Sequence, residues 1–307
     1  MSTAITERSG ARCAHTDVDT GPPSVTVVGG GAAGLTAAWA AAEQGAQVTV
    51  LERTREAGKK ILMSGGSRCN VLPAEVELER DFFTSGRPAE LKAIFRRCSW
   101  EECHWWLSAE DQVGLRLSLE ETTSKYYPAS NSAREVRDRL VRGCLRRGVR
   151  FEYNASVEEL RREGAGQWLC RLKDGRQHLA DRLVWATGGK SFPAVGTDGT
   201  GHRLLSAGGH HIQPTYPALT PLTGPHPGGE PLAGVSLNVH LMCQAAGSDW
   251  DGGERGGTKG TGLKLQHGIR TGGHHLAVKH AARSGMVFTH RGYSGPSVLD
   301  LSHFAVQ

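Results

Sequence analysis

The chain is short of hydrophobic and aromatic residues, and it has no long apolar run. Only 38% of its 307 residues are hydrophobic whereas 41 are glycine, a balance that predicts a folded part accompanied by loose polar segments. No apolar stretch reaches the ~18 residues of a transmembrane helix, so we expect no membrane partner. Residues 1–23 are polar, carry acidic side chains and lack an apolar centre, which fits neither a secretory signal nor a transit peptide and favours a disordered tail.

Paired cysteine motifs are also absent. The seven cysteines include no Cys-x-x-Cys, and although Cys98 and Cys103 are five residues apart, the odd total argues against a disulfide framework. We therefore predict free thiols in a reducing compartment such as the cytoplasm, and no secretion. Four histidines between residues 267 and 280 match no tetrahedral zinc spacing, so we expect no metal site. The net charge of +5 is too weak a signal to predict a nucleic-acid partner.

What the chain does contain is a glycine turn between two predicted strands, 25–28 and 48–51, with a small-residue helix over 35–44. Gly29, Gly31 and Gly34 fit the pattern Gly-x-Gly-x-x-Gly: the first permits a tight turn, the second lets a pyrophosphate approach the backbone, and the third lets the helix pack closely. Free N–H groups at the helix start, including those of Ala32 and Ala33, would face the phosphates. Glu52 follows Gly29 by 23 residues, where a carboxylate can accept both ribose hydroxyls of an adenosine. The stretch predicts a dinucleotide site.

A second polar turn follows at residues 64–70, which read Ser-Gly-Gly-Ser-Arg-Cys-Asn. Its backbone N–H groups and its one cation suit a phosphate or the polar edge of a ring, although an ordinary loop is the alternative. Cys69 invites a redox role, but it lacks a second cysteine at the spacing of a flavin disulfide reductase, so a structural thiol is favoured. No Ser/His/Asp triad or carboxylate pair stands out, and the catalytic residues stay unassigned.

The remaining elements predict an α/β fold. Two short helices lie within 88–109, the second with a capping box formed by Ser99 and Glu102. A helix over 133–147 is predicted to be capped by Ser132, with an apolar face of Val136, Leu140, Cys144 and Leu145. Its six arginines suggest either an anion-binding surface or, as we favour, a solvated face. Strands are predicted over 149–153, 168–172, 177–179 and 183–187, with a hairpin at Asp174-Gly175.

Taken in order, these elements predict a mononucleotide-binding half with a crossover β-ribbon. Its last strand runs into Gly188-Gly189, at the carboxyl edge of the sheet where ligands bind. We predict a tail over 1–23, a Rossmann-like domain over 24–190 and a β-rich domain over 191–307. Residues 244–285, rich in glycine and without periodicity, are predicted to be disordered.

With these pieces together, the sequence resembles the BaiN-like (aminoacetone-oxidase-like) FAD/NAD(P)-dependent oxidoreductases. The resemblance rests on six blocks: VVGGGAAGLTAA (27–38), GKKILMSGGSRCN (58–70), KYYPASNSA (125–133), ATGGKSFP (186–193), PALTPL (217–222) and FTHRGYSGPSVL (288–299). It implies FAD as the cofactor, NADPH or NADH as a transient reductant, an inserted β-barrel-like domain, and hydride transfer through the flavin to a small-molecule acceptor that the sequence does not identify. It also implies that the cofactor-binding residues are Gly29, Gly31, Ala32, Ala33, Gly34, Glu52, Arg53, Lys60, Ser64, Gly65, Gly66, Arg68, Cys69, Asn70, Thr187 and Gly188.

The chain departs from the family pattern in three places. Ser67 replaces a glycine, Val71-Leu72 replace a polar pair, and the family's closing flavin segment does not follow the last block. We therefore expect a C-terminally truncated relative, so a nucleotide-binding paralogue without activity is the alternative function. A flavin enzyme acting on tRNA is a third and weaker interpretation, based on the pI of 8.9 and the arginine-rich helix.

Overall fold

The computed structural model describes residues 21–82, 86–164, 166–239, 241 and 285–305. The predicted tail, apart from residues 21–23, and almost all of the predicted disordered stretch at 244–285 lie outside these residues, as do the four histidines. The described residues fall into two compact units that divide between Ile212 and Gln213. The first unit ends at Ile212, and the predicted end of the Rossmann-like domain at residue 190 stays a prediction.

The first unit is built on a parallel sheet with the strand order β10–β1–β2–β6. Strand β1 (Ser24–Val28) leads through the glycine turn into helix α1 (Ala32–Glu43) and strand β2 (Gln47–Leu51), as predicted. Strands β6 (Arg150–Glu152) and β10 (Arg182–Trp185) complete the sheet, and Val27 pairs with Val184 on one side and Val50 on the other. The α/β class and the parallel sheet are confirmed.

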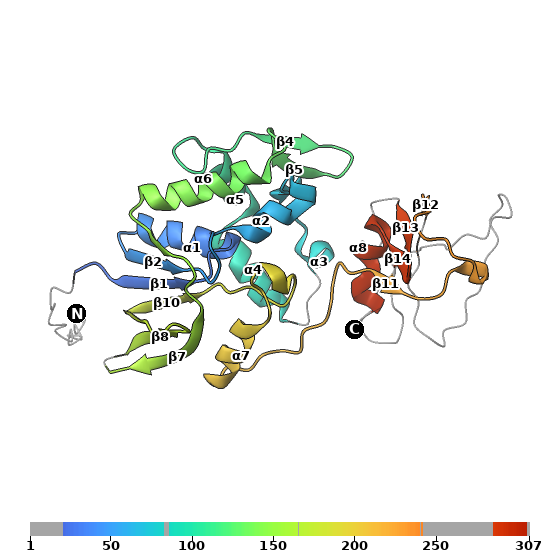
Figure 1. Cartoon of the computed structure of the whole chain (residues 1–307). Helices are drawn as coiled ribbons and strands as arrows, with labels where there is room; N and C mark the ends of the chain where they lie inside the picture. Colours follow the sequence, from blue (N-terminus) through green and yellow to red (C-terminus); the bar gives the residue numbers. More distant parts are fainter. Residues whose placement is uncertain (1–20, 83–85, 165, 240, 242–284, 306–307) are drawn as a thin grey trace, which may run out of the picture. The chain divides into compact units, whose positions relative to one another are not determined.

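Helices α1 and α6 (Ala133–Arg146) cover one face of this sheet, and a β-ribbon covers the other (Figure 1). Alternate residues divide between the faces: Val25 and Val27 point to the helices, whereas Val28 points to the ribbon. The predicted small-residue helix lies close to α6, because a Cβ on Gly143 of α6 would stand 1.7 Å from the ring of the fully buried Trp39. Gly143 is therefore the residue that lets the two helices approach.

Helix α6 confirms the predicted helix but corrects two of its details. Val136, Leu140 and Cys144 are buried as predicted, whereas Leu145 is 55% exposed because its position falls outside the stripe that faces the core. Ser132 occupies the N-cap position but its side chain makes no capping hydrogen bond. Gly148, with a φ of +77°, ends the helix as expected.

The ribbon consists of β7 (Val157–Glu163), β8 (Gln167–Leu172) and β9 (Gln177–Ala180), joined antiparallel in that order. The hairpin at Gly175 and its two flanking strands are confirmed. Strand β7 was not predicted, because its charged sequence lacks a clear apolar alternation. The ribbon is tied to β1 by Asp181, whose carboxylate accepts hydrogen bonds from the Gln167 side chain and from the backbone and hydroxyl of Ser24.

The remaining elements of the first unit surround the helical layer. They are α2 (Lys59–Met63), the 3-10 turn η1 (Ser64–Ser67), β3 (Leu72–Pro73), α3 (Leu78–Asp81), α4 (Pro88–Arg97), α5 (Trp100–Ser108), β4 (Leu117–Glu120), β5 (Lys125–Pro128), η2 (Pro193–Val195) and α7 (Thr200–Ala207). The capping box of α5 is confirmed: Ser99 Oγ accepts from the Glu102 N–H, and the Glu102 carboxylate accepts from the Ser99 N–H.

The second unit contains an antiparallel sheet with the order β11–β14–β13–β12, covered by helix α8 (Pro296–Ala305). Its strands are β11 (Leu222–Thr223), β12 (Ser236–Leu237), β13 (Met286–Thr289) and β14 (Gly292–Ser294), and a short turn, η3 (Pro227–Gly229), lies between the first two. Met286, Phe288, Val298 and Leu301 form its core. The described part of this unit is therefore one antiparallel sheet packed against one helix. Across the described parts of both units, every helix is too short or too polar to span a bilayer.

Candidate cofactor site

The carboxyl edge of the parallel sheet gathers the predicted nucleotide-binding turns. Because β1, β2 and β10 run parallel, Gly29, Glu52 and Thr187 leave the sheet at the same edge. Strand β2 lies on one side of β1, and β10, which comes later in the chain, lies on the other side. The strand order therefore reverses between β1 and β10, and this is the topological switch point of the sheet. Ligands of open α/β sheets bind at this place.

The three motif glycines have three different surroundings. Gly29 has a φ of +104°, and a Cβ on it would stand 2.5 Å from the Ala186 carbonyl oxygen, so only glycine fits between the two strands. A Cβ on Gly34 would stand 1.8 Å from the Gly29 carbonyl oxygen, so this glycine lets α1 pack on the turn. A Cβ on Gly31 would meet nothing within 4 Å. The backbone at Gly31 therefore faces open space at the start of α1, where N–H groups and the helix dipole favour an anion.

Glu52 is buried beneath the turn with 9% of its surface exposed. Its Oε2 accepts the N–H of Gly30 at 2.8 Å, and its Oε1 accepts the N–H of Thr54 at 2.8 Å. These bonds orient the carboxylate and tie the end of β2 to the glycine turn. Each oxygen uses one of its acceptor positions and keeps another for a hydroxyl group.

These groups share one cavity of about 1060 Å³ within the first unit. Most of the predicted cofactor-binding residues line it: Gly29, Gly31, Ala32, Ala33, Glu52, Arg53, Lys60, Ser64, Cys69, Asn70, Thr187 and Gly188. Gly34, Gly65, Gly66 and Arg68 are not among the lining residues. The cavity is as large as the largest small-molecule sites of proteins, which reach ~1,000 Å³.

Lys60 supplies a positive charge beside the glycine turns. A Cβ on Gly188 would lie 3.2 Å from Lys60 Nζ, which places the ammonium against the turn that follows β10. No carboxylate in the described part of the chain pairs with this ammonium, and the residue is half-buried. An unpaired cation on the wall of the same cavity as the start of α1 suits a phosphate group.

The turn after α2 has an unusual backbone. Gly65, Gly66, Ser67 and Cys69 all have φ between +54° and +70°, in the left-handed region that favours glycine. Ser67, a residue with a Cβ, is therefore strained. Cys69 is buried against the cavity, and burial raises the pKa of its thiol, so it is protonated at neutral pH.

Arg68 is held by side chains on and beside the β4–β5 ribbon. Its Nε donates to Asn131 Oδ1 at 2.8 Å, one terminal nitrogen donates to Glu120 Oε2 at 2.7 Å, and the guanidinium stacks over the Tyr127 ring. The hydrogen bond with Glu120 raises the pKa of Arg68. The side chain thus fastens the 64–70 turn to the β4–β5 ribbon, and its predicted contact with a cofactor stays a prediction.

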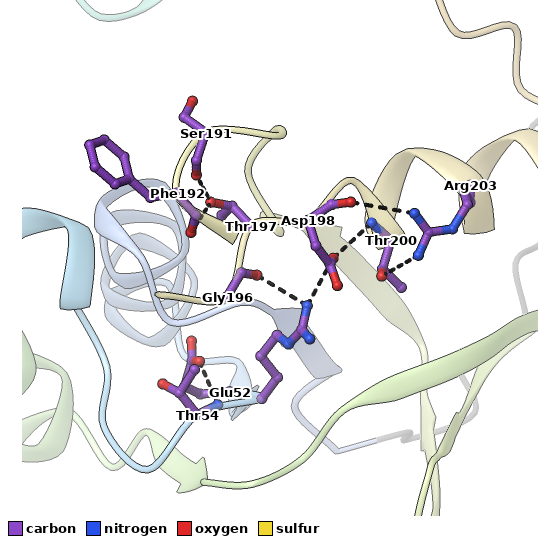
Figure 2. A network of polar contacts seen from close by, with 10 residues as sticks. Glu52, Thr54, Ser191, Phe192, Gly196, Thr197, Asp198, Thr200 and Arg203 are labelled. Carbon is purple, nitrogen blue, oxygen red and sulfur yellow. Dashed lines mark hydrogen bonds and ion pairs between the residues drawn. The ribbon is translucent and has the colours of Figure 1, made fainter. Parts of the chain in front are cut away.

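A loop after η2 contributes residues that the sequence did not single out. Asp198 Oδ1 accepts from the Arg53 guanidinium at 2.9 Å and from the Thr200 N–H at 3.0 Å, and its backbone oxygen accepts from Arg203 (Figure 2). The hydrogen bonds from Arg53 and Thr200 hold the pKa of Asp198 well below its usual range. Arg53 therefore links the end of β2 to the start of α7, along the cavity wall. The one signal in the sequence that could have identified this loop is the pair of glycines, Gly196 and Gly199, that flank Asp198.

Comparison with known proteins identifies the family. Residues 23–287 match the HI0933-like protein Rossmann domain, so the chain belongs to this family of FAD-dependent oxidoreductases. The assignment confirms the resemblance found in the sequence and FAD as the cofactor. Likenesses to solved structures are weak, as with the open conformation of a flavocytochrome c3 fumarate reductase, at 21% identity and a TM-score of 0.45 over 62% of this chain and 41% of that chain.

Two curated relatives are longer than the part of them that the chain matches. It is 32% identical over 200 residues to the 3-dehydro-bile acid delta(4,6)-reductase of Clostridium scindens, covering 64% of this chain and 47% of the reductase. It is 27% identical over 282 residues to the ribosomal RNA dihydrouridine synthase of Escherichia coli, covering 91% of this chain and 60% of that protein. The chain thus spans about half to three fifths of the length of these relatives.

Proposed function

We propose that the chain is the flavin-binding part of a reductase that uses NADPH or NADH to saturate a carbon–carbon double bond conjugated to a carbonyl. The observation that carries this proposal is the open face of Gly31, at the same sheet edge as the Glu52 carboxylate and the Lys60 ammonium. Bound FAD would supply the two-electron chemistry. The sequence contains no side-chain arrangement that suggests another kind of catalysis.

The chain's own residues would hold the cofactor. The N–H groups of Gly31, Ala32 and Ala33 would donate to the diphosphate, with the dipole of α1 adding to the attraction. The ammonium of Lys60 would neutralise part of the phosphate charge. Glu52, already oriented by two backbone N–H groups, would accept the ribose hydroxyls of the adenosine.

The acceptor class is drawn from the names of the relatives. Delta(4,6)-reductase denotes reduction of double bonds in a 3-oxo bile acid, and dihydrouridine synthase denotes saturation of uridine. In both substrates the double bond is conjugated to a carbonyl, so hydride adds at the carbon remote from that carbonyl. We favour a small-molecule acceptor.

RNA is the competing acceptor, and one feature of α6 favours it. Arg134, Arg142 and Arg146 are exposed, and no carboxylate in the described residues pairs with them. Such cations bind phosphate backbones with a strong dependence on salt. The prediction that nucleic acid is not a partner is therefore open to a direct test.

The test is anaerobic reduction and reoxidation of the FAD-loaded chain. We expect NADPH or NADH to bleach the flavin absorbance, and a 3-oxo-4,6-diene steroid to restore it faster than a ribosomal RNA transcript or buffer does. Faster reoxidation by the transcript would contradict a small-molecule acceptor and indicate that RNA is the acceptor. Bleaching without reoxidation by either acceptor would contradict the proposed acceptor class, and the absence of bleaching would favour the nucleotide-binding paralogue without activity.

A lysine pair provides the matched control for the binding step. Lys60→Met removes the cation beside Gly188 and is expected to weaken FAD binding about tenfold, the value of roughly one charged hydrogen bond. Lys173→Met removes an exposed lysine at the ribbon hairpin and is expected to leave the affinity unchanged. Equal affinities for the two variants would contradict the placement of the phosphates.

A further inference from the structure

Two cysteine sulfurs are in contact at the wall of the cavity. Cys98 Sγ and Cys103 Sγ lie 3.4 Å apart, and both residues line the cavity. Of the cysteines that the structure describes, the other three are buried, whereas Cys98 is exposed and Cys103 is partly so. Among the five cysteines that the structure describes, the pair is therefore the one that a small molecule in solution can reach.

The local fold fixes this contact. Ser99 is the N-cap of α5 and forms a capping box with Glu102. In such a helix start, the residue before the N-cap and the fourth helical residue face each other, and apolar side chains usually pack there as a hydrophobic staple. Cys98 and Cys103 occupy these two positions. A disulfide needs an S–S distance of about 2.05 Å, so the two sulfurs have to approach by about 1.4 Å.

We propose that Cys98 and Cys103 form a reversible disulfide by exchange with a small-molecule disulfide, which locks the start of α5 at the cavity wall. The Cys98 thiolate attacks one sulfur of the small disulfide, whose S–S bond breaks and releases one thiolate. Cys103, after losing its proton, attacks the Cys98 sulfur of the mixed disulfide and releases the second thiolate. Two protein thiols are oxidised by two electrons, and the small disulfide is reduced to two thiols that take up the two protons.

The order of attack follows from the surroundings of the two sulfurs. Burial and the neighbouring Cys98 raise the pKa of Cys103 to about 11, so Cys103 is a protonated thiol at neutral pH. Cys98 is the exposed member and meets the incoming disulfide first. The proposal does not depend on bound FAD, and its outcome leaves the proposed reductase function untouched.

The experiment uses the full chain, reduced and then equilibrated with oxidised glutathione, quenched in acid and mapped by peptide mass spectrometry. The expected product has lost two hydrogen atoms within the peptides that carry residues 98 and 103 and holds no glutathione there. Cys103→Ser should instead accumulate glutathione on Cys98, because the second attack is removed. In Cys98→Ser, glutathione should attach to Cys103 more slowly than it attaches to Cys98 in Cys103→Ser.

Three outcomes would overturn the proposal. They are glutathione that persists on Cys98 of the unaltered chain, a mapped disulfide that joins either residue to another cysteine, and free thiols at both positions after equilibration. The double variant Cys98→Ser/Cys103→Ser is the control for folding. It should keep the circular dichroism of the reduced protein, and the mapping of the unaltered chain decides the question even if the variant does not fold.

Discussion

The glycine turn offers a substitution pair that separates binding from folding. Gly31 has φ −77° and ψ −173°, a backbone conformation open to any residue, and a Cβ there would meet no atom within 4 Å. Gly31→Ala is therefore expected to change the free energy of unfolding by no more than about 1 kcal/mol, because restriction of the unfolded chain by alanine offsets the preference of a helix N-cap for glycine. The new methyl group would occupy the space that we assign to the diphosphate.

The expected loss of affinity follows from one hydrogen bond. Displacing a phosphate from the helix N-terminus costs at least one charge-assisted bond, ~1.5–3 kcal/mol, which corresponds to roughly a 10- to 150-fold increase in the Kd for FAD. Gly34→Ala should behave in the opposite way. Its methyl group would stand 1.8 Å from the Gly29 carbonyl oxygen, so the turn must shift, and we expect a loss of about 3 kcal/mol of stability.

The assay is fluorescence titration of each folded variant with FAD, combined with urea unfolding of the same preparations. The reasoning fails if Gly31→Ala binds FAD as tightly as the unaltered chain. It fails equally if Gly31→Ala loses as much stability as Gly34→Ala, because the open space in front of Gly31 would then not exist.

Three further predictions concern stability and are measured by urea unfolding. Gly143→Ala should cost about 3 kcal/mol, because its Cβ would stand 1.7 Å from the Trp39 ring; an unchanged unfolding midpoint would contradict the close helix contact. Ser67→Gly should stabilise by about 0.5–1 kcal/mol, since it relieves a φ of +70°, and a loss of stability would show that the serine side chain is needed. Hydrogen bonds, chiefly from Gln167, lower the pKa of Asp181 in the folded protein to about 2. Asp181 therefore contributes fully to the free energy of unfolding at pH values above its unfolded pKa of ~3.9, and this contribution is lost as the pH falls towards 2. The stability difference between Asp181→Ala and the unaltered chain should therefore shrink between pH ~5 and ~2, and a difference independent of pH would refute this.

Local patterns predicted the elements that local interactions determine. The strand, glycine turn, helix and strand over residues 24–51 follow from side-chain periodicity and from backbone freedom at Gly29, and the structure reproduces them. The capping box at Ser99 and Glu102 depends on two groups three residues apart, and both bonds are present. The family blocks added FAD, which the glycine turn alone did not distinguish from other dinucleotides.

Features that depend on contacts between residues far apart in the chain were harder to predict from the sequence. Arg68 stands in a turn that the sequence assigned to the cofactor, but Glu120 and Asn131 draw its guanidinium to the β4–β5 ribbon. The Arg53–Asp198 ion pair joins residues 145 positions apart, and neither residue signals the other. Strand β7 gains its order by pairing with β8 rather than from its own charged sequence. The compartment, the domain boundary at residue 190 and the individual cofactor contacts stay predictions.

The most direct test of the central claim is a crystal structure of the chain with FAD bound. The account predicts the diphosphate within hydrogen-bond distance of the N–H groups of Gly31, Ala32 and Ala33, and the adenosine ribose hydroxyls on the Glu52 carboxylate. A diphosphate bound away from the start of α1, or a ribose that does not contact Glu52, would contradict it.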